Sequence, residues 1–178
     1  MYAGLFGRVT SCTIKNVKVT GNINSTNIAG GIIGSAICGQ FEENDLPEIT
    51  NCTNYANVNS LITAGGIIGH KAGSRGIISD CHNFGDIHAD ENSGGGIIGI
   101  CDGKGIIRNN YNFSSIYGGT RAGGIVGYIN STSLFLVSCV NTETAVIKSN
   151  MENGCAGGIQ GYANQITNIY NCINLRSY

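Results

Sequence analysis

A Cys-x-Asn step recurs along this chain at a fixed interval, and this regularity constrains the fold more than any other feature. The step occurs at Cys52, Cys81, Cys139 and Cys172, and Asn110 stands in the cysteine position of the one copy that lacks it. Neighbouring copies from Cys52 to Cys139 lie 29 residues apart, and the last interval is 33 residues. A nearly constant period of this length is typical of a repeat protein whose successive units stack on one another.

A glycine-rich hexapeptide accompanies each copy of the step. It reads AGGIIG from Ala29 and again from Ala64, recurs as GGGIIG, AGGIVG and AGGIQG, and has YAGLFG from Tyr2 as its first copy. Length changes fall between the two landmarks, as expected for the loops of a solenoid. We therefore predict one repeat domain over residues 1–178, a fragment of a longer protein, with coils at approximately 1–27, 28–62, 63–92, 93–120, 121–154 and 155–178.

Both landmarks lie in short segments rich in Ile and Val and bounded by Gly, Asn, Asp or Ser, which is the pattern of β-strands. No segment shows the apolar spacing of three and four residues that a helix requires, and glycine, at 28 of 178 residues, disfavours helices. We predict an all-β fold: a right-handed parallel β-helix, or solenoid, of about six coils. A β-prism or a repeat built from hairpins is the alternative, and antiparallel pairing within a unit would support it.

The asparagine of each step forms the first informative column of the repeat. In stacked coils, equivalent residues lie about 4.8 Å apart, so every column becomes a line of touching side chains. An amide carries donors and an acceptor, and a column of asparagines can therefore form a hydrogen-bonded ladder. Independent turn residues on the surface are the other interpretation. The column consists of Asn54, Asn83, Asn112, Asn141 and Asn174.

The cysteine column is interpreted as a line of small, buried hydrophobic residues. Side chains of neighbouring coils point in parallel, whereas a disulfide needs a torsion angle near 90°, so we expect no bridges within it. The column consists of Cys12, Cys52, Cys81, Cys139 and Cys172, with a degenerate first copy around Cys12. Cys38, Cys101 and Cys155 lie near the hexapeptides, and the sequence does not show how they would pair.

The hexapeptide supplies two aliphatic columns and two glycine columns. The first aliphatic column, which includes Ile32 and Ile67, is never polar and is predicted to face the interior. Adjacent residues of a strand face opposite sides, so the second column is predicted to face outward, either as an interaction stripe or covered by the variable loops. It consists of Phe6, Ile33, Ile68, Ile98 and Val126, with Gln160 in the last copy. The glycines are expected at bends or in left-handed conformations.

No motif points to catalysis or to a metal site. Cys81, His82 and His88 are close in sequence, but a closed zinc site needs four ligands, often with paired CxxC spacing, and this spacing is absent. The acidic residues that interrupt the repeat are Glu42, Glu43, Asp45 and Glu48 in one loop and Asp90 and Glu91 in another. We interpret both groups as solvated loops, and we expect no enzyme activity, no metal and no cofactor.

Charge and hydropathy argue against two classes of partner. Only 12% of residues are charged and the net charge is −1, whereas nucleic-acid-binding proteins usually carry a basic face. No run of 18 or more apolar residues occurs, so we do not expect this segment to insert into a membrane. Neither end shows an evident polar cap, so we expect the solenoid to continue into flanking domains or to self-associate.

The unit AGLFG at Ala3, with its variants GGIIG and GGIVG, resembles the GLUG motif, and the segments NCTNYANV and DCHNFGDI are similar to the half that accompanies it. The resemblance implies a bacterial secreted or cell-surface protein and a structural or adhesive role, with host protein or glycan as partner. The alternative is an accessory region that positions substrate for a secreted hydrolase such as a metallopeptidase. The peptidase zinc motif is absent, so no catalytic residue carries over. Many free thiols outside a cell would suggest an anaerobe.

Overall fold

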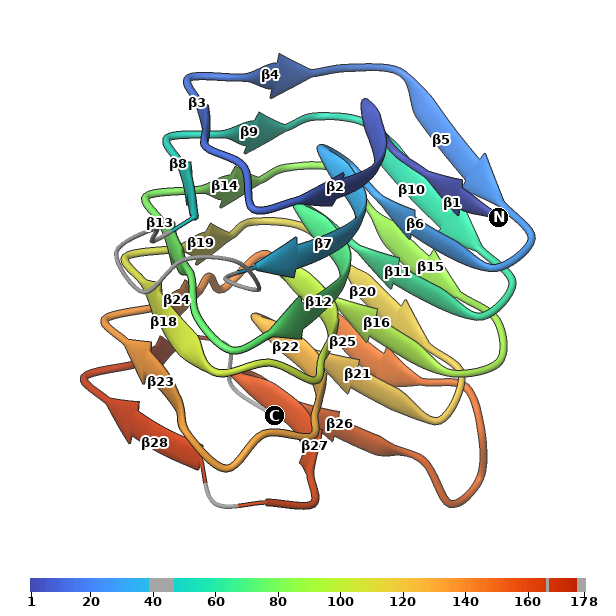
Figure 1. Cartoon of the computed structure of the whole chain (residues 1–178). Coiled ribbons are helices and arrows are strands. Elements are labelled where there is room, and N and C mark those ends of the chain that lie inside the picture. The colour runs from blue at the N-terminus through green and yellow to red at the C-terminus, as the bar shows by residue number, and fades with distance from the viewer. Residues whose placement is uncertain (39–46, 166, 176–178) are drawn as a thin grey trace.

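The computed structural model describes residues 1–38, 47–165 and 167–175, and within these ranges the chain forms strands and no helix. It winds as a parallel β-solenoid, in which each complete turn contributes one strand to each of five sheets, A to E (Figure 1). Every strand pairing that the described residues form is parallel, which confirms the predicted solenoid and excludes the hairpin alternative. The stack comprises five complete turns and four strands of a sixth.

The strands of each sheet follow one another along the stack. Sheet A consists of β1 (Tyr2–Ala3), β6 (Ile28–Gly30), β11 (Thr63–Gly65), β16 (Ser93–Gly95), β21 (Arg121–Gly123) and β26 (Cys155–Gly157). Sheet B consists of β2 (Phe6–Thr10), β7 (Ile33–Cys38), β12 (Ile68–Gly73), β17 (Ile98–Cys101), β22 (Val126–Ile129) and β27 (Gln160–Ala163). Sheet C consists of β3 (Ile14–Lys15), β8 (Glu48–Thr50), β13 (Ile77–Ser79), β18 (Gly105–Arg108), β23 (Leu134–Val137) and β28 (Thr167–Tyr170). Sheet D consists of β4 (Lys18–Val19), β9 (Thr53–Asn54), β14 (His82–Asn83), β19 (Tyr111–Asn112), β24 (Val140–Asn141) and β29 (Ile173–Asn174). Sheet E consists of β5 (Asn22–Ser25), β10 (Asn57–Ser60), β15 (Ile87–Ala89), β20 (Ile116–Gly118) and β25 (Ile147–Ser149).

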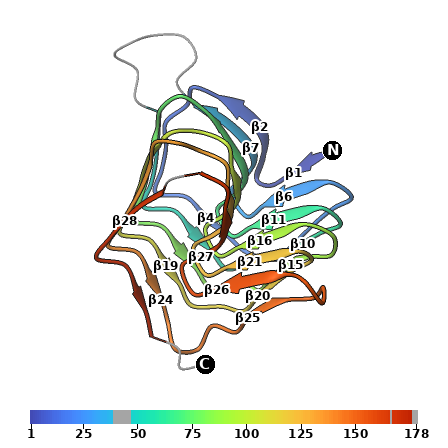
Figure 2. The ribbon, with the colours of Figure 1, turned by 90° about the horizontal axis from the view of Figure 1, so that it is seen from below.

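The solenoid encloses two separate apolar cores, and Figure 2 shows the two lobes of the ribbon that surround them. Sheets B, C and D surround the larger core, which is filled by Ile, Leu, Val and Cys side chains. Sheets A and E face each other across a thinner core made of small and medium side chains such as Ala64, Ile87 and Ala122. We call the two parts the wide lobe and the narrow lobe. The hexapeptide lies where they join, since it runs from sheet A into sheet B.

The corner between sheets C and D depends on residues in the left-handed conformation. The residue just before the cysteine column has positive φ in every turn, between 52° and 61°. These residues are Asn16, Asn51, Asp80, Asn109, Ser138 and Asn171. Most are Asn or Asp, whose short polar side chains tolerate this conformation better than other non-glycine residues. The first residue of NCTN is therefore a corner residue.

The hexapeptide glycines were expected at bends or in left-handed conformations, and the structure shows bends. Among the described glycines, positive φ occurs at Gly21, Gly73, Gly76 and Gly105, and at no glycine of the hexapeptides. Gly31 lies in a bend between β6 and β7. Their lack of a side chain matters for the space that it leaves.

Candidate functional site

The asparagine ladder is confirmed and runs along the inner side of sheet D. Each amide nitrogen donates to the Oδ1 of the asparagine one turn further on, at 2.8 Å from Asn54 to Asn83 and 2.9 Å from Asn83 to Asn112. The bonds continue at 2.8 Å to Asn141 and again to Asn174. Four of the five side chains are fully buried, all except Asn174, so they are not independent surface turns.

Three of the ladder asparagines, Asn54, Asn83 and Asn112, also hydrogen-bond to the backbone two residues further along their own turn. The Nδ2 of Asn54 donates to the carbonyl of Ala56 at 2.8 Å, and the Oδ1 of Asn54 accepts from the amide of Ala56 at 3.0 Å. Asn83 and Asn112 likewise donate to the carbonyls of Gly85 and Ser114. Because buried amides are costly unless their donors and acceptors are paired, this arrangement satisfies the column in its buried position.

One glycine of each hexapeptide makes room for the ladder. A Cβ added at Gly31 would lie 2.5 Å from the Cγ of Asn54, and one added at Gly66 would lie 2.6 Å from the Cγ of Asn83. The same contact recurs at Gly96, Gly124 and Gly158. The hexapeptide and the asparagine step of one turn therefore touch at the neck, the narrow passage between the two lobes, and this contact explains why they recur together.

The cysteine column lies in register on the wide-lobe core. Strand register aligns Cys52, Cys81, Asn110, Cys139 and Cys172 one below another. Cys12 does not belong to this column, because the pairing of Lys18 with Thr53 places Val17 there. Cys52, Cys81 and Cys139 are fully buried, Cys172 is half-buried, and all eight cysteines are free thiols.

The cysteines of the last two turns affect each other's pKa. The neighbouring thiol of Cys139, together with two backbone contacts, lowers the pKa of Cys172 to about 6 against the opposing effect of burial. The interaction with Cys172 and burial both raise the pKa of Cys139. The Cys139 thiol itself lies 3.5 Å from the carbonyl oxygen of Ile107 and 3.6 Å from that of Val137.

Lys71 is a buried charge that no pattern in the sequence predicted. Its side chain is fully buried in the wide lobe, and its Nζ donates to the carbonyl of Lys104 at 2.5 Å. Burial raises the pKa of the thiols of Cys38 and Cys101, and the positive charge of Lys71 opposes that rise. Cys12 also lies close enough to Cys38 to affect its pKa.

The expected outward orientation of the second aliphatic column must be corrected. Ile33, Ile68, Ile98 and Val126 have no exposed surface and belong to the wide-lobe core, as does the first aliphatic column. The physical reason is the bend at the neck: it interrupts the alternation of facing directions, so both residues of the pair point inward. Phe6 is 38% exposed because it lies on the end turn. The column is not an interaction stripe.

An exposed aromatic cluster lies on sheet D instead. The rings of Tyr55 and Phe84 are stacked with centroids 5.0 Å apart, and those of Phe84 and Phe113 at 4.5 Å. Beside them, His82 and Tyr111 contact each other at 5.3 Å with tilted rings. Tyr55 and Phe84 are 48% and 42% exposed. We call these five residues the aromatic face.

Strand alternation produces the aromatic face. The ladder asparagines point into the wide lobe, so the residues on either side of each asparagine point outward. A signal was present in the sequence, because aromatic residues follow the asparagine in the adjacent copies NCTNY, DCHNF and NNYNF. No Lys, Arg, Asp or Glu belongs to the cluster.

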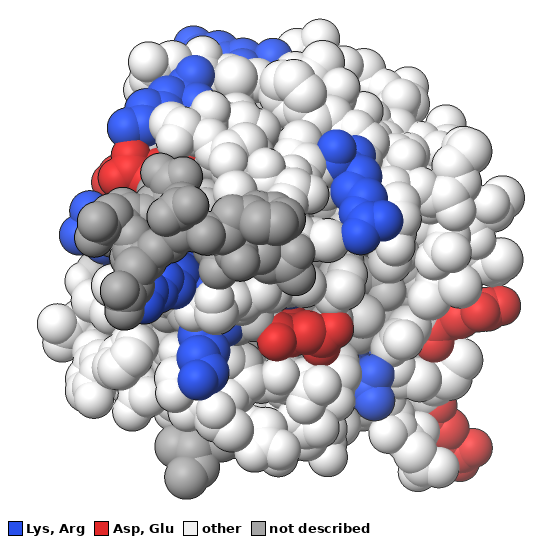
Figure 3. Space-filling model, viewed as in Figure 1, with Lys and Arg blue, Asp and Glu red and all other residues white. Residues whose placement is uncertain are grey.

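The charged side chains form small, separate groups, and Figure 3 shows such groups over the visible face. Lys15 pairs with Glu48, the Nε2 of His70 lies 2.7 Å from Asp102, and His88 lies 3.1 Å from Asp90. The bond to His70 lowers the pKa of Asp102. Glu42, Glu43 and Asp45 lie outside the described residues. In the part of the chain that the structure describes, no group of three or more His, Cys, Asp or Glu is arranged to hold a metal ion, and no helix is long and apolar enough to cross a membrane.

The fold and the ladder define a class: the chain is a β-solenoid repeat protein with an asparagine ladder. Comparisons with protein-family models, with curated proteins and with solved structures find no match.

Proposed function

We propose that this chain is a non-catalytic structural and adhesive repeat module of a bacterial secreted or cell-surface protein, and that its aromatic face binds a host protein or glycan. The likeness of its repeats to the GLUG motif belongs to this proposal. The observation that carries it is the exposure of Tyr55 and Phe84 within the aromatic face. Clusters of exposed aromatic residues are characteristic of binding surfaces.

The geometry of the rings defines the kind of ligand that would fit. The planes of Tyr55 and Phe84 differ by 9° and those of Phe84 and Phe113 by 6°, so each ring covers part of its neighbour's face. The three stacked rings of Tyr55, Phe84 and Phe113 form a strip along the solenoid axis. An extended ligand, such as a sugar chain or an apolar peptide segment lying along that strip, would contact several rings at once.

The scaffold holds this strip rigidly. Each ring is attached beside a ladder asparagine, and Asn83 and Asn112 are hydrogen-bonded to ladder neighbours on both sides. Binding would therefore require little ordering of the rings, and a preordered surface loses less entropy on association.

Replacement of one ring tests the proposal. The chain is applied to an array of glycans and to immobilised extracellular host proteins, and the best ligand is titrated against Phe84→Ala and Phe135→Ala. Phe84 and Phe135 are 42% and 40% exposed, but Phe135 lies on sheet C, away from the aromatic face. We expect Phe84→Ala to weaken binding about tenfold or more, or roughly 1.4 kcal/mol, and Phe135→Ala to have little effect. Equal losses for both variants, or no ligand in either class, would contradict the proposal.

A further inference from the structure

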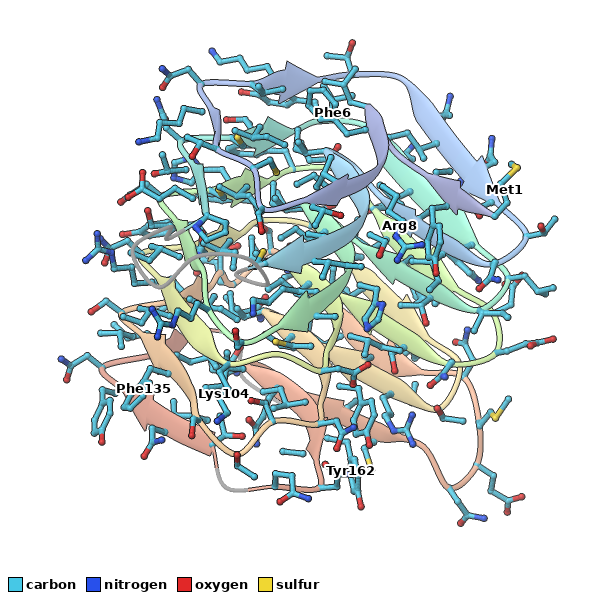
Figure 4. All side chains as sticks on the ribbon, viewed as in Figure 1. Met1, Phe6, Arg8, Lys104, Phe135 and Tyr162 are labelled. Carbon is cyan, nitrogen blue, oxygen red and sulfur yellow. The ribbon has the colours of Figure 1, made fainter. Side chains whose placement is uncertain are left out.

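A polar pocket lies at the corner between sheets B and C, on the connections that follow β12, β17 and β22 in three interior turns. Its volume, about 360 Å³, is within the range of about 300 to 1,000 Å³ that is usual for ligand sites. Figure 4 labels Lys104, which belongs to the connection between β17 and β18. We call it the corner pocket. Its polar lining on these turns includes Asp102, Lys104, Asn130, Ser131 and Thr132, and Gln165 of the following turn adds a further amide.

Unequal connections account for the hollow. Between the residues that pair in sheets B and C, the connection of the fourth turn has four residues, whereas those of the third and fifth turns have five each. The fourth connection therefore takes a tighter corner. Gly103 lies in it against the third turn: a Cβ added there would be 2.4 Å from the carbonyl oxygen of Gly73 and 2.7 Å from the Nζ of Lys71. The longer connections on either side project further and leave the pocket between them.

The walls of the corner pocket are fixed by hydrogen bonds. The backbone N–H of Asp102 donates to the carbonyl of Lys71 at 2.9 Å, and that of Asn130 donates to the carbonyl of Cys101 at 2.9 Å. From below, the buried Nζ of Lys71 donates to the carbonyl of Lys104. The pairing of the strands thus continues into the connections, and a preordered pocket loses less entropy when it binds a ligand.

Asp102 provides a fixed, ionised acceptor. Its Oδ2 lies 2.7 Å from the Nε2 of His70, and its side chain is 37% exposed. The bond to His70 lowers the pKa of Asp102, burial opposes this effect, and Asn130 adds a smaller lowering. The carboxylate is therefore charged at neutral pH. A carboxylate only accepts hydrogen bonds, and its two oxygens together can accept several.

The other side chains of the lining complement hydroxyl groups. The Lys104 ammonium donates, the Asn130 amide both donates and accepts, and the hydroxyls of Ser131 and Thr132 can do either. A sugar hydroxyl also donates and accepts, so it can pair with each of these groups. One carboxylate and one ammonium balance each other in the lining, which favours a ligand without net charge.

We propose that the corner pocket binds a single neutral sugar unit, with Asp102 accepting from its hydroxyls and Lys104 and Asn130 donating to them. The pocket lies between sheets B and C, whereas the aromatic face lies on sheet D. It is a separate site, and this inference does not depend on the adhesive role.

The test titrates the whole chain with the methyl glycosides of glucose, galactose, mannose and N-acetylglucosamine, and follows the backbone amides by NMR. We expect at least one sugar to bind with a dissociation constant on the order of a millimolar and to shift the amides of residues 102–104 and 130–132. Asp102→Asn should weaken that binding about tenfold. The matched control is Asp90→Asn, because Asp90 also lies beside a histidine, 3.1 Å from His88, but in the narrow lobe. This control should bind as the parent does.

A second control separates the corner pocket from the aromatic face. Phe84→Ala should leave the affinity for the sugar unchanged, and a loss would place the sugar on sheet D and overturn the proposal. No shift with any of the four sugars at tens of millimolar, equal losses for the two Asp variants, or tighter binding of glycine or inorganic phosphate than of any sugar would also overturn it. If Asp102→Asn alters the amide spectrum before sugar is added, Lys104→Ala replaces it, because Lys104 is exposed; we expect that variant to weaken binding about fivefold, and no change would overturn the proposal.

Discussion

The interior turns and the end turns share one sequence plan, yet their equivalent residues lie in very different surroundings. Ile67 is fully buried, whereas Leu5 in the same column is 52% exposed. Asn83 bonds to ladder neighbours on both sides, whereas the ladder bonds of Asn174 join it to Asn141 alone. The comparison shows that a repeat gains its stability from the turns above and below it more than from contacts within itself.

The largest expected loss of stability comes from a carboxylate placed in the second aliphatic column of an interior turn. Ile68→Glu buries a charge among apolar side chains, where Ile68 has no exposed surface. We expect a loss of more than about 5 kcal/mol, which is comparable to the whole stability of many domains. Circular dichroism should then show an unfolded chain.

Phe6→Glu is the matched change in the same column of the first turn, where the side chain is 38% exposed. The carboxylate can reach water there, so we expect a loss of about 1 kcal/mol or less in urea unfolding. Similar losses for the two variants would mean that the interior and the end turns do not differ as described.

A smaller effect should come from shortening the asparagine ladder. Asn83→Ala removes a buried amide that donates to Asn112 and accepts from Asn54, and it leaves those partners incompletely bonded. We expect the free energy of unfolding in urea to fall by about 3 kcal/mol. Asn174→Ala, at the half-buried end of the ladder, should cost about 1 kcal/mol. A ladder that contributes nothing would give equal, small changes at both positions.

The smallest expected effect is chemical and leaves stability nearly unchanged. With a pKa of about 6, Cys172 should be mostly thiolate at pH 7, and its alkylation rate should rise between pH 5 and 7 (about one unit either side of that pKa) and level off above. Cys81, fully buried and with a raised pKa, should not react in the folded chain. Mass spectrometry of the alkylated peptides measures both rates.

Removal of the neighbouring thiol provides the control for this prediction. Cys139→Ala deletes the neighbouring thiol that chiefly lowers the pKa of Cys172, so the rise in alkylation should move to higher pH. An unchanged pH profile would show that Cys139 does not set the reactivity of Cys172.

The constant interval was sufficient to predict the stack and most of its columns. Residues 29 apart had to lie one above another once the strands were parallel, so the ladder from Asn54 to Asn141 followed directly. The first turn departs from this interval, which is why Cys12 was placed in a column that Val17 occupies. Equivalent residues of successive turns can be aligned from the sequence alone only where the loops between them keep a constant length.

Two local features limited the prediction of the surface. The prediction of an outward column assumed that side chains alternate between the two faces across Gly31 and Ile32. These two residues form a bend between β6 and β7, where that alternation does not apply. The outward stripe was therefore placed on Ile68 and its equivalents, which are buried. The aromatic face had an alternating pattern that could have been read, but strands of two residues such as His82–Asn83 are too short to stand out.

The contact between glycine and asparagine at the neck has a consequence for how such a chain can change its length. In each turn a glycine and an asparagine of that same turn touch at the neck, as Gly66 and Asn83 do. Beyond this contact the two lobes of the turn are independent loops. The longer sequence between β7 and β8 separates two strands of the wide lobe, and the longer connection between β24 and β25 leads into the narrow lobe. Residues can thus be inserted into one lobe of a turn while the other lobe keeps its register with the turns above and below.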